Sequence, residues 1–388
     1  METYKLSDLC EILDSKRKPL SALQRAKKQG IYPYYGAQGI IDHLDDYLLD
    51  GEYLLVAEDG ANLETRNQPI ANIAKGKIWV NNHAHVLGSN GKCPLNLLGF
   101  ILNNMNISPY VTGCAQPKLN QENLRNIEIE LPSHIDSIAS ILSSLDRKIE
   151  LNNKINADLE EMAQAIFKNW FVDFEPFKGG KFVDSELGMI PEGWKVGRAD
   201  DFYQINIGKT PPRKENKWFS TNPADKIWVS IANMGNSGIF ISDSSEYLTK
   251  EAVDRHNIIM VPRNTILLSF KLTVGRVAIA DKELTTNEAI ARFILSDDKY
   301  MEYLYLYLKN FDYNSLGSTS SIATAVNSKT IKGMQMLQPS DKIIDAFHIQ
   351  VNPIFEKIRS LTKENSRLSL LRDTLLPRLM SGELEVPE

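Results

Sequence analysis

The chain has 388 residues and a mass of 43.8 kDa, which is too long for one ordinary hydrophobic core and suits two or three domains. Hydrophobic residues make up 43% and charged residues 24%, as in globular proteins, which excludes a disordered, collagen-like or low-complexity chain. The net charge of −5 speaks against a nucleic-acid binder unless basic residues are concentrated locally.

Three further features concern the cellular location. The longest apolar runs, such as residues 97–102, are far shorter than the roughly 18 residues that span a bilayer. The first residues lack the pattern of a signal or transit peptide. The three cysteines, Cys10, Cys93 and Cys114, are odd in number and widely spaced, as in proteins of a reducing compartment. We therefore expect a cytoplasmic protein without a disulfide framework and without membrane segments.

The sequence repeats a unit of nearly half its length. The matching segments keep their order along the chain and are residues 4–9 with 194–199, 54–56 with 266–268, 82–84 with 287–289, and 119–124 with 326–331. In this alignment Asn82 matches Asn287. Because the loops between the segments differ in length while the order holds, we interpret the chain as a duplication.

Each copy has the pattern of short strands with one helix near its end. Apolar residues predict strands at residues 53–57, 78–80, 127–131, 226–231, 265–270 and 291–295. The helix candidates within the copies are residues 97–103 and 299–309. The expected fold class is α+β, with a mixed α/β domain that occurs twice.

A long helix is predicted after each copy. Apolar residues recur three and four positions apart from Ile135 to Trp170, and again from Ile344 to Leu379. We expect Pro353 to start or kink the second helix, because proline removes one backbone hydrogen bond. Two seams of equal length in one chain most simply pack on each other as an antiparallel coiled coil. The expected architecture is then a pseudo-two-fold dumbbell, with two heads joined by a helical bar.

Asn156 and Asn365 occupy equivalent positions near the middle of the two seams. In an antiparallel pair they could meet and fix the register, at some cost in stability. The alternative is that both lie at the solvated edge of the seam.

The expected domain limits follow from these elements. They are residues 1–133 for the first head, 134–174 for the central helix, 175–193 for a linker rich in turn-forming residues, 194–340 for the second head, and 341–388 for the distal helix and C-terminal tail.

No enzyme signature is found in the sequence. A phosphate-binding loop, a Gly-x-Ser-x-Gly turn and a His-Glu-x-x-His motif are all absent. Residues 352–355, Asn-Pro-Ile-Phe, are similar to the Asn-Pro-Pro-Phe/Tyr loop of amino-methyltransferases. They lie in the helical seam, however, and no glycine-rich cofactor loop accompanies them.

A zinc site is not expected either. The candidate ligands, which have no standard spacing, are His83, His85, Cys93 and Cys114. In the alignment above, the second copy has Glu288 and Ile290 at the positions of the two histidines. We therefore expect no metal in this chain.

Charge is distributed unevenly along the chain. Residues 15–41 contain six basic residues and no acid, whereas residues 42–64 contain eight acids and no Lys or Arg. The corresponding segment of the second copy, residues 208–218, has four basic residues and one acid. A basic, aromatic loop with Gln, Asn and Thr suits DNA, since cations bind phosphates and amides bind base edges. The alternative is a charged loop that is merely solvated.

The whole chain resembles the specificity subunits of type I restriction–modification systems. One typical segment is Tyr-Pro-Tyr-Tyr-Gly-Ala-Gln-Gly at residues 32–39. The others are residues 79–87, 115–120 leading to 129–132, 208–211, 228–231, 269–275 and 375–384. Each motif alone is weak, but their combination extends from one end of the chain to the other and is specific.

The resemblance implies a DNA-recognition subunit with no catalytic site of its own. Each head would read one half of a bipartite, asymmetric site in double-stranded DNA, and the two helices would set the spacer between the halves. Two modification subunits with S-adenosylmethionine would methylate adenine, and restriction subunits with ATP and Mg²⁺ would join afterwards. No cofactor is expected in this chain itself.

The candidate DNA contacts are polar or aromatic residues in the basic loops and in the family segments. They are Lys16, Arg17, Lys18, Tyr34, Tyr35, Gln38, Asn82, His83, Lys209, Thr210, Arg213, Lys214, Asn233, Lys271, Thr273, Arg276 and Asn287. Among them, Lys209, Arg213 and Lys214 are expected at phosphates, and Asn233 and Thr273 at base edges. The first head has Glu58-Asp59 where the second has Phe270-Lys271, so no phosphate contact is expected from that loop of the first head.

Two other classes of function remain open. A structural interpretation makes the chain a coiled-coil scaffold whose heads bind protein or sugar, and a binding test with duplex DNA and the modification subunit would separate it. An enzymatic interpretation requires a cofactor site that the sequence does not contain.

Overall fold

The computed structural model describes residues 2–113, 116–132, 134–316 and 326–384. The chain divides into two compact units, Met1–Glu150 with Ser366–Glu388, and Leu151–Asn365. Both units combine helices with sheets, which confirms the expected mixed α/β class. Cys114 and Ser133, which figured in the zinc and domain predictions, lie outside the described residues. Among the described helices, none has the length and apolar character needed to cross a membrane.

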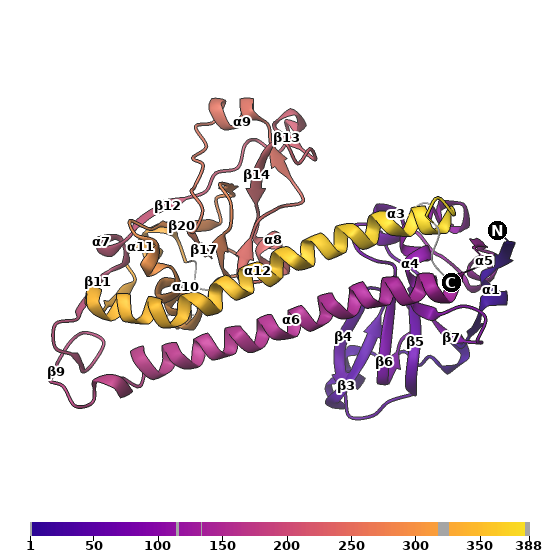
Figure 1. Ribbon diagram of the computed structural model, residues 1–388, viewed down its shortest axis with the longest axis horizontal. Helices are drawn as coiled ribbons and strands as arrows, with labels where there is room; N and C mark the ends of the chain where they lie inside the picture. The colour runs from indigo at the N-terminus through magenta and orange to yellow at the C-terminus, as the bar shows by residue number, and fades with distance from the viewer. Residues whose placement is uncertain (1, 114–115, 133, 317–325, 385–388) are drawn as a thin grey trace. The chain divides into compact units, whose positions relative to one another are not determined.

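The first unit is built on a six-stranded sheet (Figure 1). In spatial order the strands are β2 (Cys10–Ile12), β7 (Ala84–Ser89), β5 (Leu49–Ala57), β6 (Ala71–Val80), β3 (Gln29–Gly36) and β4 (Gly39–Leu44). Neighbours pair antiparallel except β3 and β6, which run parallel. Because successive residues of a strand point to opposite faces, Leu54 and Val56 pack toward helix α4 (Leu95–Asn104) while Leu55 packs on the other face.

The second unit contains two sheets. The larger one has the order β12 (Gln204–Ile207), β20 (Ile290–Ile294), β17 (Ile266–Ser269), β18 (Val277–Ala280) and β15 (Phe240–Ile241). The smaller one has the order β13 (Phe219–Ser220), β16 (Tyr247–Leu248), β14 (Lys226–Val229) and β19 (Thr285–Thr286). The pairs β14–β19 and β15–β18 are parallel and the others are antiparallel.

Each head also has a two-stranded ladder that pairs its first strand with its last. These ladders join β1 (Glu2–Lys5) to β8 (Glu128–Leu131), and β11 (Lys195–Arg198) to β21 (Gln335–Gln338). The shorter helices of the first unit are α1 (Leu6–Leu9), α2 (Ala22–Ala26), α3 (Asn62–Thr65) and α5 (Gln121–Arg125). Those of the second are α7 (Ala199–Phe202), α8 (Ile231–Asn236), α9 (Lys250–Arg255), α10 (Met301–Asn310) and α11 (Ser328–Lys332).

Two of these short helices support the predicted duplication. Asn120 caps α5 by accepting a hydrogen bond from Asn123 N–H, and Asn327 caps α11 in the same way. At the start of the copies, however, the predicted match of residues 4–9 with 194–199 is wrong by three positions. Leu6 and Ala199 take the same place, since each begins a short helix and donates its N–H to the carbonyl just before the last strand.

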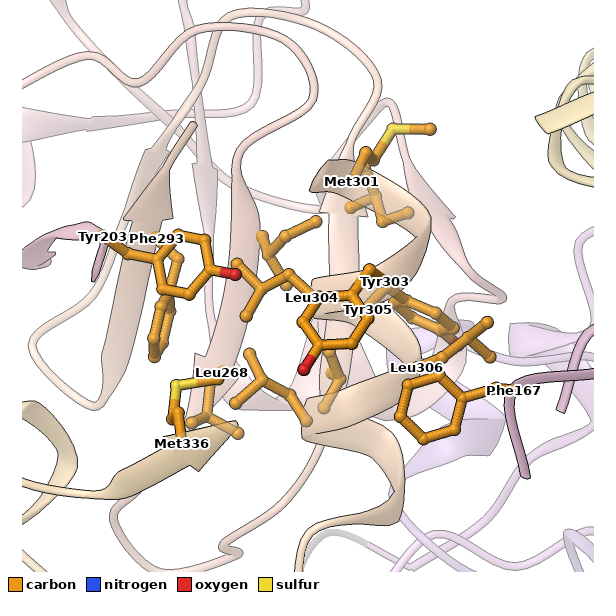
Figure 2. Packing of buried hydrophobic residues seen from close by; sticks show 14 of the residues in the cluster. Phe167, Tyr203, Leu268, Phe293, Met301, Tyr303, Leu304, Tyr305, Leu306 and Met336 are labelled. Carbon is orange, nitrogen blue, oxygen red and sulfur yellow. The ribbon is translucent and has the colours of Figure 1, made fainter. Parts of the chain in front are cut away.

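The largest hydrophobic core lies in the second unit, around α10. Figure 2 shows Tyr303 and Tyr305 of α10 among side chains from the sheet, such as Phe293, and beside Phe167 from the long helix α6 (Ile135–Phe171). The rings of Phe167 and Tyr303 have centroids 5.9 Å apart. Aromatic side chains bury large apolar areas, so this contact fixes the head on its part of α6.

The segment expected as a surface linker, residues 175–193, is partly folded. Its strands β9 (Phe182–Val183) and β10 (Ile190–Pro191) form a small sheet. The indole of Trp194, which follows, packs against Phe171 and Phe177 with centroid distances of 5.7 and 5.1 Å. The turn-forming residues predicted the chain reversals, but aromatic residues dock the segment on the core.

Both predicted long helices are confirmed (Figure 1). Helix α6 runs over Ile135–Phe171 and helix α12 over Asp341–Met380. The second helix begins at Asp341, so Pro353 lies within it.

Within the second unit, α6 and α12 run in opposite directions. Asn152 of α6 contacts Asn365 of α12, while Phe171, farther along α6, contacts Phe347, which comes earlier on α12. The ring centroids of Phe171 and Phe347 are 4.8 Å apart.

The predicted pairing of Asn156 with Asn365 is wrong. The Nδ2 of Asn152, which is fully buried, donates to Asn365 Oδ1 at 2.9 Å, and Asn365 Nδ2 donates to Asn153 Oδ1 at 2.8 Å. Asn156 donates instead to Thr362 Oγ1 at 3.5 Å. The contact is therefore one helical turn away from the predicted one, and in this register Asn365 still bonds to amides of α6.

Replacing Asn152 tests this register. Asn152→Leu removes the buried donor to Asn365 and should lower the free energy of unfolding by about 1–3 kcal/mol. Asn152→Leu combined with Asn365→Leu should cost less than the sum of the two single changes. Urea denaturation of all three variants measures this coupling, with Asn156→Leu as the control that should show less coupling to Asn365→Leu. Additive effects for Asn152 and Asn365 would contradict the contact.

Candidate nucleic-acid interface

In the first head, the basic loop lies against the turn between β6 and β7. The loop contains a 3₁₀ helix, η1 (Asp14–Lys16), followed by Arg17 and Lys18. Lys18 N–H donates to Val80 O at 3.0 Å, and Arg17 Nη1 donates to Ala84 O at 3.0 Å. These bonds bring the predicted contacts at residues 16–18 beside those at residues 82–83.

The sequence predicted that the aromatic segment next to this loop is also a loop. This prediction is wrong. Residues 29–36 form strand β3, whose Tyr34 is 1% exposed. The Tyr34 hydroxyl accepts a hydrogen bond from Leu20 N–H at 2.9 Å, so this side chain helps to hold the basic loop in place. Tyr35 is half-buried, and Gln38 is exposed in the turn between β3 and β4.

A buried ionic network holds the basic loop in place. The Arg17 guanidinium contacts Glu58 Oε2 at 2.5 Å and Asp14 Oδ2 at 3.2 Å. His85, which is fully buried, places Nδ1 2.6 Å from Asp14 Oδ2 and Nε2 2.7 Å from Leu119 O. Both ring nitrogens face acceptors, so both contacts are satisfied when the ring carries two protons.

The acids of this network are held in their charged form. Burial raises the pKa of Asp14, but hydrogen bonds from His85 and Val86 N–H and the charges of His85 and Arg17 bring it below its usual value. Burial likewise raises the pKa of Glu58, and the Arg17 hydrogen bond, His85 and Lys118 more than reverse this effect. The network therefore combines two carboxylates with the cations of Arg17 and Lys118 and with the imidazole of His85.

These acids could be mistaken for a metal site. Ligand atoms of Asp14, Glu58 and His85 all lie within 4.8 Å of one another. Their oxygens already accept hydrogen bonds or ion pairs from Arg17 and Lys118, which supply the positive charge that a metal ion would bring. We therefore interpret Asp14, Glu58 and His85 as residues that stabilise the fold and not as metal ligands.

In the second head, the corresponding loop lies at the same end of the sheet. Lys209 N–H donates to Thr286 O at 2.9 Å, as Lys18 N–H does to Val80 O in the first head. Lys18 and Lys209 therefore occupy equivalent positions. The Lys209 ammonium donates to His256 O at 2.6 Å, and the Thr210 hydroxyl donates to Glu288.

Arg213 and Lys214 differ in their surroundings. The Arg213 guanidinium makes two hydrogen bonds to Glu246, at 2.7 and 3.0 Å, and lies over the rings of Phe219 and Trp228. The hydrogen bonds to Glu246 raise the pKa of Arg213 above its usual value. Lys214 is exposed.

The predicted contacts near helix α8 lie beside one another. Asn233 accepts a hydrogen bond from Ser230 N–H at 2.9 Å in a capping box. Arg276 Nη1 donates to Ile231 O at 2.8 Å, which ties the β17–β18 turn to the same helix. Lys271 and Thr273 of that turn are exposed.

The ladders of the two heads correct the predicted alignment of Asn82 with Asn287. Asn81 N–H donates to Tyr35 O at 3.0 Å, and Asn287 N–H donates to Val229 O at 3.0 Å, in both cases beside a parallel strand pair. Asn81 is thus the counterpart of Asn287, and the predicted match is wrong by one residue. The match of His83 and His85 with Glu288 and Ile290 shifts in the same way.

The seventeen predicted contacts fall into two groups. Within the described residues, no hydrogen bond or ion pair involves the side chains of Lys16, Lys18, Tyr35, Gln38, Asn82, Lys214, Lys271 and Thr273. The side chains that bond to their own head are Arg17, Tyr34, His83, Lys209, Thr210, Arg213, Asn233, Arg276 and Asn287.

Sequence reasoning missed Asp14 and His85, which position the basic loop. They are far apart in the sequence, and no spacing rule connects them. The one signal was that Asp14 directly precedes a stretch up to Ile41 with six basic residues and no acid, where an ion pair with a neighbouring cation is expected.

Comparison with known proteins gives the family. A family model described as the type I restriction modification DNA specificity domain matches residues 1–161 and 191–348. Because these matches cover more than half of the chain, the protein belongs to this family.

Two relatives and one solved structure agree with this assignment. The chain is 28% identical to the type I restriction enzyme HindI specificity subunit of Haemophilus influenzae over 69% of its length and 71% of that protein. It is 32% identical to the MjaIX specificity subunit of Methanocaldococcus jannaschii over 71% of its length and 65% of that protein. The crystal structure of a type I system S subunit from M. genitalium has a TM-score of 0.56 and 14% identity, covering 100% of this chain and 96% of that one, which shows a shared fold.

Replacing Asp14 tests the network. Asp14→Asn removes the buried carboxylate that His85 Nδ1 and Arg17 contact, which leaves Glu58 as their one acidic partner, and should lower the free energy of unfolding by about 3–5 kcal/mol at pH 7. Since the folded-state pKa of Asp14 is lowered, its contribution is present above its unfolded pKa and is lost as the pH falls below about 4.

Denaturation at several pH values measures this difference between the variant and the natural chain. Asp45→Asn, at an exposed carboxylate 3.5 Å from Lys28, is the matched control and should change stability little. A difference for Asp14→Asn that stays constant down to pH 3 would show that its charge does not stabilise the fold.

Proposed function

We propose that this chain is a non-catalytic DNA-recognition subunit whose two heads each read one half of a bipartite site. The observation that carries the proposal is the equivalent placement of Lys18 and Lys209, each on a loop at the same end of a sheet in its own head. Loops that are distant in the sequence meet beside each lysine: Arg17 donates to Ala84 O, and Thr210 donates to Glu288. Such a surface suits a DNA groove, where cations bind phosphates and polar groups bind base edges.

The two groups of side chains take different roles in this proposal. The unbonded residues, such as Lys16, Lys214, Gln38 and Thr273, contact DNA directly. The bonded ones, such as Arg17, hold the loops in the shape that DNA requires. In this proposal Tyr34 supports a loop and does not contact a base.

The long helices act as a spacer in this proposal. Helix α6 contributes residues 135–150 to the first unit and 151–171 to the second, without a break in its hydrogen bonding. A helix of that length extends about 55 Å. An antiparallel coiled coil of α6 with α12 would hold the heads apart as a pseudo-two-fold dumbbell and so fix the number of unread base pairs.

The chemistry belongs to partner subunits in this proposal. Two modification subunits with S-adenosylmethionine methylate an adenine in each half of the site, and restriction subunits use ATP and Mg²⁺. The complex would act in the cytoplasm. This chain binds the DNA and positions the partner subunits, because its charged loops direct them to one sequence.

Lengthening the helices tests the spacer. Inserting seven residues after Asn153 and seven after Glu364 keeps the heptad seam in register and adds about 10 Å. At about 3.4 Å per base pair, the recognised site should keep both halves and gain about three base pairs between them. Sequencing methylated adenines in cells with the modification subunit measures the spacer. An unchanged spacer with normal methylation would mean that the helices do not set the distance.

Two single substitutions test the roles at the DNA. In the complex with modification subunits, Lys214→Ala should weaken binding to all sequences and lower the salt dependence by about one unit. Thr273→Ala should instead relax the choice at one position of the site, by about 1–3 kcal/mol. Binding titrations at several salt concentrations, with Lys250→Ala as an exposed control on the same head, measure both effects. A loss of selectivity from Lys214→Ala and none from Thr273→Ala would contradict the assignment.

A further inference from the structure

The turn between β17 and β18 carries the most exposed large apolar side chain of the described residues. Leu272 has a relative exposure of 101%, so its whole side chain is in solvent. Its φ of +61° lies in the left-handed region, which branched side chains rarely adopt and which Gly or Asn would favour. An exposed, apolar and strained residue has no value for the fold of the free chain.

Contacts on both sides hold the turn in one conformation despite this exposure. The Ser269 hydroxyl donates to Thr273 O at 2.5 Å and accepts from Arg276 N–H at 3.0 Å, which ties both sides of the turn together. Gly275, with a φ of +90°, packs so closely on Tyr313 that an added Cβ would lie 3.0 Å from its ring. These contacts therefore hold the Leu272 side chain in solvent at the tip of the turn.

The surroundings of Leu272 favour DNA as the partner that covers it. Lys271 and Thr273 are its exposed neighbours, and Arg276 is fixed to helix α8, on which Asn233 also lies. Proteins that insert an apolar side chain between two base pairs surround it with cationic and polar side chains that bind the DNA. Leu272 has neighbours of the same kind. A protein surface would instead meet an isolated leucine with little apolar area around it.

We infer that Leu272 is a wedge that inserts between neighbouring base pairs of the half-site read by the second head and unstacks them. This inference rests on the proposed function. The first head has no equivalent, because Glu58 and Asp59 correspond to Phe270 and Lys271, and the next residue, Gly60, has no side chain. Unstacking by a leucine is therefore confined to one half-site.

The test uses the full chain assembled with its modification subunits and duplexes of the sequence that this complex methylates. Single 2-aminopurine bases replace adenines other than the methylated ones, which leave the stack for the chemistry itself. The natural complex should raise the fluorescence at one position of the second half-site and at none of the first. Leu272→Asn and Leu272→Ala should abolish that rise and weaken specific binding several-fold, whereas Leu272→Phe should keep it.

Thermal unfolding separates the wedge from a role in folding. Leu272→Asn should be as stable as the natural chain or more so, because Asn tolerates a positive φ. Ile259→Ala, at an apolar side chain 52% exposed in the same head, is the matched control and should leave fluorescence and binding unchanged.

Three results would overturn the inference, each in a recognisable way. A complex that methylates its site while no 2-aminopurine brightens, or one in which Leu272→Asn keeps the signal, excludes the wedge. Loss of modification subunits from the Leu272→Asn chain without DNA would assign the leucine to a protein contact. A natural complex that methylates no specific sequence would refute the proposed function, and the wedge with it.

Discussion

Backbone pairing at the ends of the sheets is the constraint on which the candidate interface depends. In the first head Glu58 N–H donates to His83 O at 2.9 Å, and in the second Phe270 N–H donates to Ala289 O at 2.9 Å. These bonds extend the ladders β5–β7 and β17–β20 into the loops. Because ladder bonds allow only one register, loops far apart in the sequence emerge side by side in both heads. Different side chains on the same frame then give the two heads different surfaces.

The electrostatics of the frame explain how an acidic chain can present cations to DNA. Several arginines are paired with acids of their own head, as in Arg17–Glu58, Arg25–Asp42 and Arg213–Glu246. These pairs fix loops, while exposed lysines such as Lys18 and Lys214 keep their charge available. In the proposed function, the net charge of −5 would repel DNA from the rest of the surface, so binding would be limited to the places where these lysines lie.

The sequence predicted the repeated elements better than their pairing. The two long helices and the strands at residues 53–57 and 266–269 follow from apolar periodicity, which is a local signal. The register of Asn365 with Asn152 does not follow from it, because Asn152 and Asn156 are both seam positions one turn apart, and periodicity along one helix does not say which of them meets the other helix. The alignment paired Asn287 with Asn82 instead of Asn81. The loops of the two copies differ in length, and the sequence around these residues does not reveal a shift of one position.

Residue type predicted where the basic loops lie in the sequence, but not which partners their side chains contact. Residue type indicated that Arg17, Arg213 and Lys214 belong to basic loops, yet only the folded chain brings Glu58 and Glu246 to the two arginines. Partners of this kind come from distant strands, and charge patterns along the sequence do not reveal them. Strand β3 was taken for a loop because its tyrosines and glycines are also common in turns.

Exchange of one head tests the central claim, that each head reads its own half-site. Residues 194–339 would be replaced by the same region of a relative with a different site, and methylated adenines would be sequenced in cells that contain the modification subunit. The account predicts a site in which one half is new and the other half and the spacer are unchanged. A site in which both halves change together would show that the heads do not read DNA independently.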